Sequence, residues 1–298
     1  MTATDAPPKP SIRLGRLVRL ARPRQWVKNG FVLLPVIFAG KLTDPKAWAA
    51  AGLYAVAFVL ASVAVYCLND VLDADADRRH PRKKRRPVAA GEVTPATALT
   101  LAGGCVVAAV GLAAWLGREP LAVLGLYLGL SLVYCLSWKH QPLLDVMTVA
   151  AGFLLRTVGG AVAIGATPSP WLLMCTSLLA LVLALSKRRA EVARGTDPAA
   201  PTRPVLAHYP LPLLDQLITG MVPTTLLTYM LYAYHTHPPA FLVTAVFVAY
   251  GLFRYLYLMH TRDAGEQPEE VLLTDRPTLV NLVLWAVTSA VLMGRTAS

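Results

Sequence analysis

Long apolar stretches separated by short basic loops are the feature that most constrains how this chain can fold. A helix that crosses a membrane needs about 20 largely apolar residues, and 55% of the 298 residues here are hydrophobic while 15% are charged. A soluble domain carries roughly 25% charged residues. The sequence therefore predicts an all-α, polytopic membrane protein with one transmembrane domain over 1–298. Residues 1–12 of that domain are predicted to form a disordered tail. We count nine apolar stretches, at 29–40, 47–68, 96–116, 120–138, 142–165, 169–186, 212–234, 238–260 and 277–294.

The basic residues lie on alternate sides of these stretches. The net charge of +11 would suit a nucleic-acid partner, but 22 of the 28 Lys and Arg residues fall in alternating connections, and 4 fall in the others. Cytoplasmic loops of membrane proteins carry such an excess. We therefore expect no nucleic acid as a partner and a multi-pass protein of the plasma membrane. The connections expected in the cytoplasm, where the active site should face, are 1–28, 69–95, 139–141, 187–211 and 261–276.

Acidic side chains gather at the cytoplasmic end of the second apolar stretch, in the sequence NDVLDADAD over 69–77. If the helix continues, Asp70, Asp73 and Asp77 share one face. A helix C-terminus disfavours negative charge, so a merely solvated helix end explains these acids poorly. Carboxylate oxygens suit Mg²⁺, which also binds substrate phosphates. We predict all three as metal ligands, Asp73 and Asp77 as catalytic residues, and Asn69 as a substrate-binding residue.

A strongly basic run, RRHPRKKRRPVAAG over 78–91, follows the acids directly. On its own, such a run is typical of a patch that orients the protein or binds lipid headgroups. Beside a metal site it also suits phosphate binding, with Lys as a point charge and Arg as a two-pronged donor. Within this run we choose Lys83 and Arg86 as substrate-binding residues.

Other polar residues lie on or near the same predicted side of the membrane. Several of these residues can be explained without a substrate. Basic residues beside a membrane span orient it, and a carboxylate at the start of a helix is electrostatically favourable. Arg156 differs, since a charge inside a span is costly and usually faces a polar cavity. The further candidates are Asp145 for catalysis and Lys28, Asn29, Lys139, Arg156, Lys187, Arg188 and Glu266 for substrate binding.

The pattern Asn69-Asp70-x-x-Asp73-x-x-x-Asp77 at the end of a second span resembles the first aspartate motif of the UbiA superfamily of membrane prenyltransferases. The resemblance covers nearly the whole chain. It implies a ring of nine helices around a central cavity that is capped on the cytoplasmic side, with Mg²⁺ as cofactor.

The chain lacks one motif that many members of that superfamily carry, and this difference indicates which branch of the superfamily it resembles. Members with aromatic substrates usually carry a second motif, Asp-x-x-x-Asp, after the fourth span, whereas Asp145 here has Gln141 before it and Val149 after it. The chain is instead similar to the decaprenyl-phosphate phosphoribosyltransferase branch, which uses phosphoribosyl pyrophosphate (PRPP), a polyprenyl phosphate and Mg²⁺ in actinobacterial arabinan biosynthesis. The matching pieces are RPRQWVKN over 22–29, His80-Pro81-x-Lys83-x-x-Arg86-Pro87, Lys139-His140-Gln141, Leu155-Arg156, Lys187-Arg188 and Gly265-Glu266-x-Pro268-Glu269.

Two activities follow as hypotheses. The abundant basic residues favour transfer of 5-phosphoribose from PRPP to a polyprenyl, decaprenyl-type phosphate with release of pyrophosphate, because both substrates carry phosphates. The alternative is a prenyltransferase that moves a prenyl group from a prenyl diphosphate to a small, aromatic acceptor. A transporter or lipid-binding protein fits less well, because only Arg156 and Arg254 fall within spans. The sequence leaves open the prenyl chain length and the oligomeric state, a homo-oligomer included.

Overall fold

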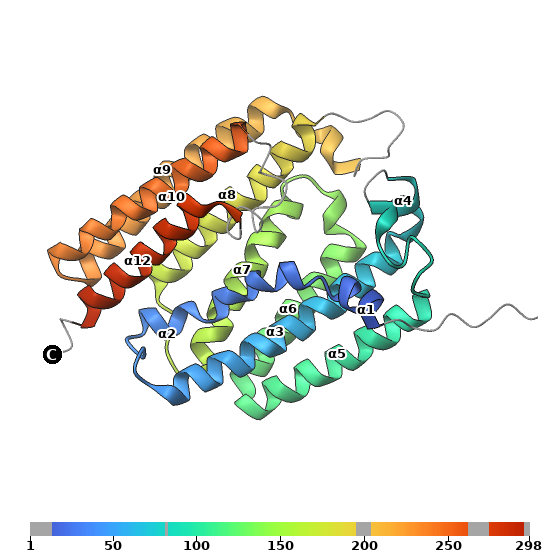
Figure 1. Ribbon diagram of the computed structural model, residues 1–298, viewed down its shortest axis with the longest axis horizontal. Helices are drawn as coiled ribbons and strands as arrows, with labels where there is room; N and C mark the ends of the chain where they lie inside the picture. The colour runs from blue at the N-terminus through green and yellow to red at the C-terminus, as the bar shows by residue number, and fades with distance from the viewer. Residues whose placement is uncertain (1–13, 81–82, 195–203, 262–273, 295–298) are drawn as a thin grey trace, which may run out of the picture.

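The computed structural model describes residues 14–80, 83–194, 204–261 and 274–294, which form helices and contain no strand (Figure 1). The prediction of an all-α protein is therefore confirmed. The predicted tail at 1–12 and the candidate Glu266 lie outside the described residues. The helices are α1 (Leu14–Ala21), η1 (Pro23–Val32), α2 (Leu34–Phe38), α3 (Pro45–Leu72), α4 (Ala74–Arg79), η2 (Lys83–Arg85), α5 (Pro95–Leu116), α6 (Arg118–Leu136), η3 (Trp138–His140), α7 (Leu144–Ala163), α8 (Pro170–Ala193), η4 (Pro204–His208), α9 (Leu211–Thr236), η5 (Pro239–Val243), α10 (Thr244–Thr261) and α12 (Arg276–Gly294).

Seven helices in the described part of the chain are long and apolar enough to cross a membrane: α3, α5, α6, α7, α8, α10 together with η5, and α12. Helix α9 has 26 residues, but its threonines and prolines, with Asp215 and His235, make it less apolar. The predicted count of nine spans is not confirmed. The stretch at 29–40 is not one regular helix, because η1 ends at Val32 and the short α2 begins anew with Pro35 in its first turn. Proline lacks an N–H and restricts the preceding residue, so it starts a helix more readily than it continues one.

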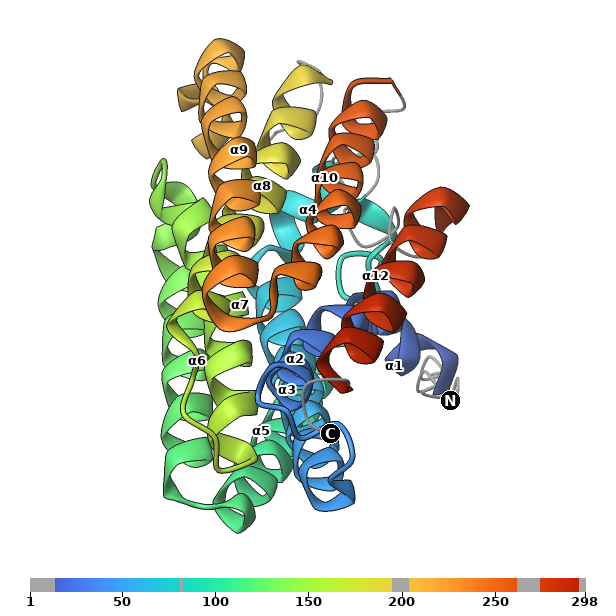
Figure 2. The same cartoon turned by 90° about the vertical axis from the view of Figure 1, so that its left-hand side faces the viewer.

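The long helices pack against one another in chain order from α3 to α12, and η1 packs on α3 and α7 (Figures 1 and 2). Helix α2, near the start of the chain, also contacts helices near its end. The ring centroid of Phe38 in α2 lies 5.6 Å from that of Tyr232 in α9 and 6.3 Å from that of Trp285 in α12. Because successive long helices alternate in direction, the C-terminal ends of α3 and α8 and the N-terminal end of α7 meet at one end of the molecule.

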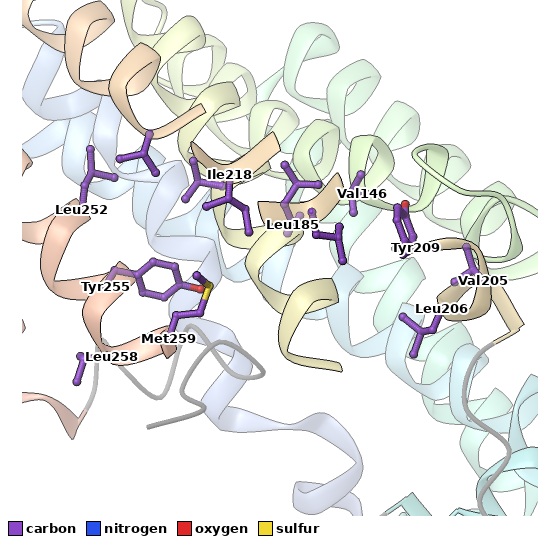
Figure 3. Packing of buried hydrophobic residues seen from close by; sticks show 14 residues of the cluster. Val146, Leu185, Val205, Leu206, Tyr209, Ile218, Leu252, Tyr255, Leu258 and Met259 are labelled. Atoms are coloured by element: carbon purple, nitrogen blue, oxygen red, sulfur yellow. The ribbon is translucent and has the colours of Figure 1, made fainter. Parts of the chain in front are cut away.

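An apolar cluster fixes η4 at that same end. It joins residues of α7, α8, η4, α9 and α10, and Figure 3 shows Tyr209 lying beside Val205 and Leu206. Burial of such side chains is the main favourable term in folding, so this cluster holds the segment that carries Tyr209 against α7 and α8. The labelled members of the cluster are Val146, Leu185, Val205, Leu206, Tyr209, Ile218, Leu252, Tyr255, Leu258 and Met259.

Two adjacent glycines allow α7 to approach its neighbours closely. A Cβ atom at Gly160 would overlap the backbone carbonyl of Val32, the last residue of η1, and one at Gly159 would lie 2.5 Å from the ring of Tyr54. The carbonyl is backbone and cannot rotate away. The close contact therefore places η1, with Asn29 on it, directly against α7.

We expect Gly160→Ala to destabilise the protein by about 1–3 kcal/mol, the usual cost of inserting extra volume into a packed site. Thermal unfolding in detergent measures the effect. Gly125→Ala is the matched control, because a Cβ at Gly125 in α6 meets nothing within 4 Å. Equal melting temperatures for the two variants would contradict the close contact.

Candidate active site

Three aspartates lie where α3 meets α4. Helix α3 ends at Leu72, yet the N–H of Asp73 donates to the Asn69 carbonyl at 2.9 Å and the N–H of Asp77 donates to the Asp73 carbonyl at 2.8 Å. Helical spacing thus continues through the junction. Asp70 and Asp77 are buried, with exposed fractions of 1% and 3%, and Asp73 is partly exposed. The chain therefore holds several carboxylates in a partly dehydrated place, where each needs a positive partner.

Basic side chains from three other segments neutralise these carboxylates. Arg22 hydrogen-bonds to Asp70 through Nη2 and Oδ1. Nη1 of Arg86 lies 2.7 Å from Oδ2 of Asp77 and 3.3 Å from Oδ1 of Asp70, so one guanidinium joins two acids.

The third carboxylate has its own partners. Nζ of Lys139 in η3, itself buried, lies 2.6 Å from Oδ1 of Asp73. Nδ2 of Asn69 donates to Oδ2 of the same carboxylate at 3.0 Å. The structure thus brings together Asn69, Arg86, Lys139 and the three aspartates, all of which are sequence-derived candidates.

The oxygen atoms of these aspartates are suitable ligands for a divalent cation, but the three carboxylates are not arranged around a common point in this structure. Among the described residues, no three His, Cys, Asp or Glu side chains are arranged to hold a metal ion. However, Oδ2 of Asp70 is buried without a hydrogen-bond partner, and such an atom is costly to leave unpaired. Carboxylate oxygens are the ligands that Mg²⁺ prefers. Asp70 could therefore act as a first ligand, and Asp73 and Asp77 could join it if their basic partners were released.

Arg22 belongs to this site although it was not among the candidates. It precedes Pro23 with φ 51°, one of two positive φ values at non-glycine residues in the described chain, and its Cζ lies 5.1 Å from the ring centroid of Tyr66. Positive φ at such a residue costs energy and is often found at functional sites. The signal for it was present in the RPRQWVKN segment, whose first residue is Arg22.

Asp145 lies fully buried at the start of α7 in a second charged cluster. Its Oδ2 is 2.5 Å from Nε of Arg188, and its Oδ1 accepts a hydrogen bond of 2.5 Å from the Tyr209 hydroxyl. Arg188 also contacts Glu191 at 2.5 Å and the Tyr134 hydroxyl at 3.4 Å. Both oxygens of Asp145 are thus engaged within the protein.

Tyr209 is not among the chosen site candidates, because its place in the sequence is equally typical of an ordinary interfacial tyrosine, yet it anchors this second cluster. Its hydroxyl donates to Asp145 and accepts from the N–H of Leu143 at 2.6 Å. Leu143 is the other non-glycine residue with positive φ, at 65°. Burial and the hydrogen bond to Asp145 raise the pKa of Tyr209, so the hydroxyl keeps its proton at neutral pH and remains a donor.

A third polar cluster surrounds Arg156 inside the helix bundle. Its guanidinium is buried and donates to Asn29 Oδ1 at 2.9 Å, to the Gly152 carbonyl at 2.8 Å, to Ser62 at 3.1 Å and to Tyr127 at 2.9 Å. These contacts join α7 to η1, α3 and α6. The structure thus pairs two predicted site residues, Asn29 and Arg156.

In the described part of the chain, the remaining candidates are three lysines. Lys28 in η1, Lys83 in η2 and Lys187 in α8 are all partly exposed. Each makes interactions with other parts of the chain. Their role in substrate binding stays a prediction.

Comparison with known proteins places this architecture in a family. Residues 31–274 match the UbiA prenyltransferase family. The decaprenyl-phosphate phosphoribosyltransferase of Mycolicibacterium smegmatis is 33% identical over 95% of this chain and 93% of the relative, and that of Corynebacterium glutamicum is 31% identical over 90% and 84%. A UbiA homolog from Archaeoglobus fulgidus, solved with GPP and Mg²⁺, superposes with a TM-score of 0.68 at 18% identity, covering 94% of this chain and 97% of that one.

The chain belongs to the UbiA prenyltransferase family. It is a transferase, and its many apolar helices make it a membrane protein. The resemblance inferred from the aspartate motif is therefore confirmed.

Proposed function

We propose that this protein transfers 5-phosphoribose from PRPP to a polyprenyl, decaprenyl-type phosphate and releases pyrophosphate. The observation that carries the proposal is the similarity, over at least 90% of the chain, to two decaprenyl-phosphate phosphoribosyltransferases. The site adds chemical support. Its acids are accompanied by Arg22, Arg86 and Lys139, and both proposed substrates carry phosphates that such side chains bind.

Transfer of a prenyl group from a prenyl diphosphate to a small acceptor is the second candidate, favoured by the family as a whole. The surroundings of Asp145 weigh against it. This residue stands where aromatic-substrate members carry a second pair of aspartates, yet here Gln141 and Val149 flank it. Arg188 and Tyr209 bind its two oxygens. We therefore assign Asp145 a structural role rather than the role of a ligand to a second cation.

The proposed reaction is a displacement at C1 of the ribose. An oxygen of the lipid phosphate forms the new bond to C1, and the bond from C1 to the pyrophosphate oxygen breaks with its electron pair on pyrophosphate. Asp70, Asp73 and Asp77 would hold Mg²⁺, which supplies positive charge toward the leaving pyrophosphate.

The chain itself contributes binding and orientation. When the donor binds, the three basic side chains would exchange their carboxylate partners for phosphate oxygens. This exchange is feasible because Arg and Lys form charge-assisted hydrogen bonds with carboxylates and phosphates alike. The side chains are those of Arg22, Arg86 and Lys139. The lipid phosphate is already an anion at neutral pH. It therefore requires correct placement more than a strong base.

We further propose that the end of the molecule carrying the acids faces the cytoplasm at the plasma membrane. On a background without the four native cysteines, a cysteine at Asp75 should react from the cytoplasmic side and one at His235 from the opposite side. Both positions are exposed: Asp75 lies in the first turn of α4, just beyond the end of α3, and His235 lies in the last turn of α9. Labelling of both from one side would contradict the proposed topology.

Pyrophosphate release tests the choice of donor. Purified protein with Mg²⁺ should release pyrophosphate from PRPP when a polyprenyl phosphate is present, and release should fall to background with polyprenol in its place. Release from a prenyl diphosphate with an aromatic acceptor, but none from PRPP with any polyprenyl phosphate, would favour the prenyltransferase instead.

A further inference from the structure

The buried polar cluster around Arg156 has more hydrogen-bond donors than the protein uses. A guanidinium carries five N–H groups, and the contacts of Arg156 with Asn29, Gly152, Ser62 and Tyr127 account for four. None of these partners is a carboxylate. Within the described residues, the positive charge of Arg156 therefore stands inside the helix bundle without an acidic counter-ion.

Asn29 adds a second unused donor, and its orientation is fixed by Arg156. Because a guanidinium can only donate, the atom of Asn29 that faces Nε of Arg156 must be the carbonyl oxygen Oδ1. The amide nitrogen Nδ2 then points elsewhere, and it is buried without a hydrogen-bond partner. Asn29 itself is 2% exposed. A buried donor of this kind usually has a partner, and none comes from the described part of the chain.

The cluster lies deeper in the bundle than the aspartates. Ser62 precedes Asp70 by eight residues on α3, which corresponds to about 12 Å along a helix axis. A soluble donor held by the aspartates would have its pyrophosphate at the outer cluster. Displacement at C1 requires the incoming phosphate on the opposite side of the ribose from the leaving group. The inner cluster lies further into the apolar bundle than the aspartates, on the side where the polyprenyl chain of the acceptor would lie in the hydrocarbon region.

We propose that Asn29 and Arg156 bind the phosphate of the lipid acceptor. The Nδ2 group of Asn29 donates to a phosphate oxygen, and the charge of Arg156 attracts the anion while its Nε holds the amide in place. This inference rests on the proposed function for the identity of the lipid. It makes Asn29 a binding residue and Arg156 a residue that both attracts the ligand and positions Asn29.

Asn29→Asp separates the two roles of the asparagine. The carboxylate keeps an oxygen for Nε of Arg156, so the link between η1 and α7 survives, but the donor is lost and a negative charge faces the phosphate. We expect the affinity for a polyprenyl phosphate to fall at least about tenfold, consistent with loss of a hydrogen bond to a charged group. Affinity for the uncharged polyprenol of equal chain length should be unchanged.

Asn281→Asp is the matched control, since it introduces the same change on α12, where Nδ2 already donates to the Phe247 carbonyl at 2.9 Å. Equilibrium binding of polyprenyl phosphate, polyprenol and PRPP to detergent-solubilised protein, with metal and without turnover, provides the readout. The wild type should bind polyprenyl phosphate at least about tenfold more tightly than polyprenol, a comparison that requires no variant to fold.

Each outcome decides the proposal. Loss of the preference for phosphate in Asn29→Asp but not in Asn281→Asp supports it. A wild type without that preference, or an Asn29→Asp variant that retains it, overturns it. Loss of PRPP binding alone would assign the cluster to the donor and also overturn it. If Asn29-dependent binding is found but no phosphoribosyl transfer occurs, the lipid site stands and the proposed function fails.

Discussion

Replacement of Asp73 by alanine is expected to lower kcat about a hundredfold or more while the protein remains folded. The proposed metal charge stabilises the leaving pyrophosphate, whose negative charge grows in the transition state. Loss of one preorganised electrostatic contact of this kind typically costs 10²–10³-fold in kcat. Asp73 is partly exposed at the junction of α3 and α4, so its removal should affect the reaction more than the fold. Steady-state transfer kinetics at saturating Mg²⁺ measure the effect.

Two further variants make this result specific. Asp75→Ala is the matched control, because Asp75 lies in the same acidic segment but has an 87% exposed side chain paired only with Arg78 in the described structure. It should retain nearly full activity. Asp73→Asn keeps an oxygen for Lys139 and should also lose activity, which excludes a lysine left unpaired as the cause. A near-normal kcat in Asp73→Ala would contradict the metal assignment.

Replacement of Arg188 by methionine should destabilise the protein by about 3–5 kcal/mol, because it leaves the buried carboxylate of Asp145 without its counter-ion. Both groups are almost completely buried and lie 2.5 Å apart. Thermal unfolding in detergent is the measurement. The sequence alone favours a contact between Arg188 and a substrate. Its three internal partners lead us to expect a loss of stability as well.

The pair can be tested as a unit. Combining Arg188→Met with Asp145→Asn removes both charges, and the double variant should regain much of the lost stability, since replacing a whole buried ion pair is often nearly neutral. If the stability loss of the double variant equals the sum of the losses of the two single variants, the two side chains are not coupled.

Much of the helical framework could be predicted because it depends on local properties of the chain. Runs of about 20 apolar residues predict membrane helices, and the seven long apolar helices correspond to runs of this kind. The grouping of Asp70, Asp73 and Asp77 follows from helical spacing in the same way. The break between η1 and α2 was less accessible, because it depends on how that segment packs against α3 and α7.

The partners within the site could not be predicted, because they come from distant parts of the chain. Asp145 and Tyr209 are 64 residues apart, and Asn29 and Arg156 are 127 residues apart. Nothing in a loop rich in proline indicates that its tyrosine will reach a buried carboxylate. Arg22 could have been selected from its place in a recognised segment, but its contact with Asp70 depends on a backbone conformation that the sequence does not specify.

The mass of the lipid product tests the central claim most directly. Purified protein would be incubated with PRPP, Mg²⁺ and polyprenyl phosphates of several chain lengths, and the lipids would be extracted and weighed by mass spectrometry. We predict a lipid heavier than the acceptor by one phosphoribosyl group, formed by the wild type and by Asp75→Ala but not by Asp73→Ala. Absence of that lipid at every chain length, together with prenylation of an aromatic acceptor from a prenyl diphosphate, would contradict the account.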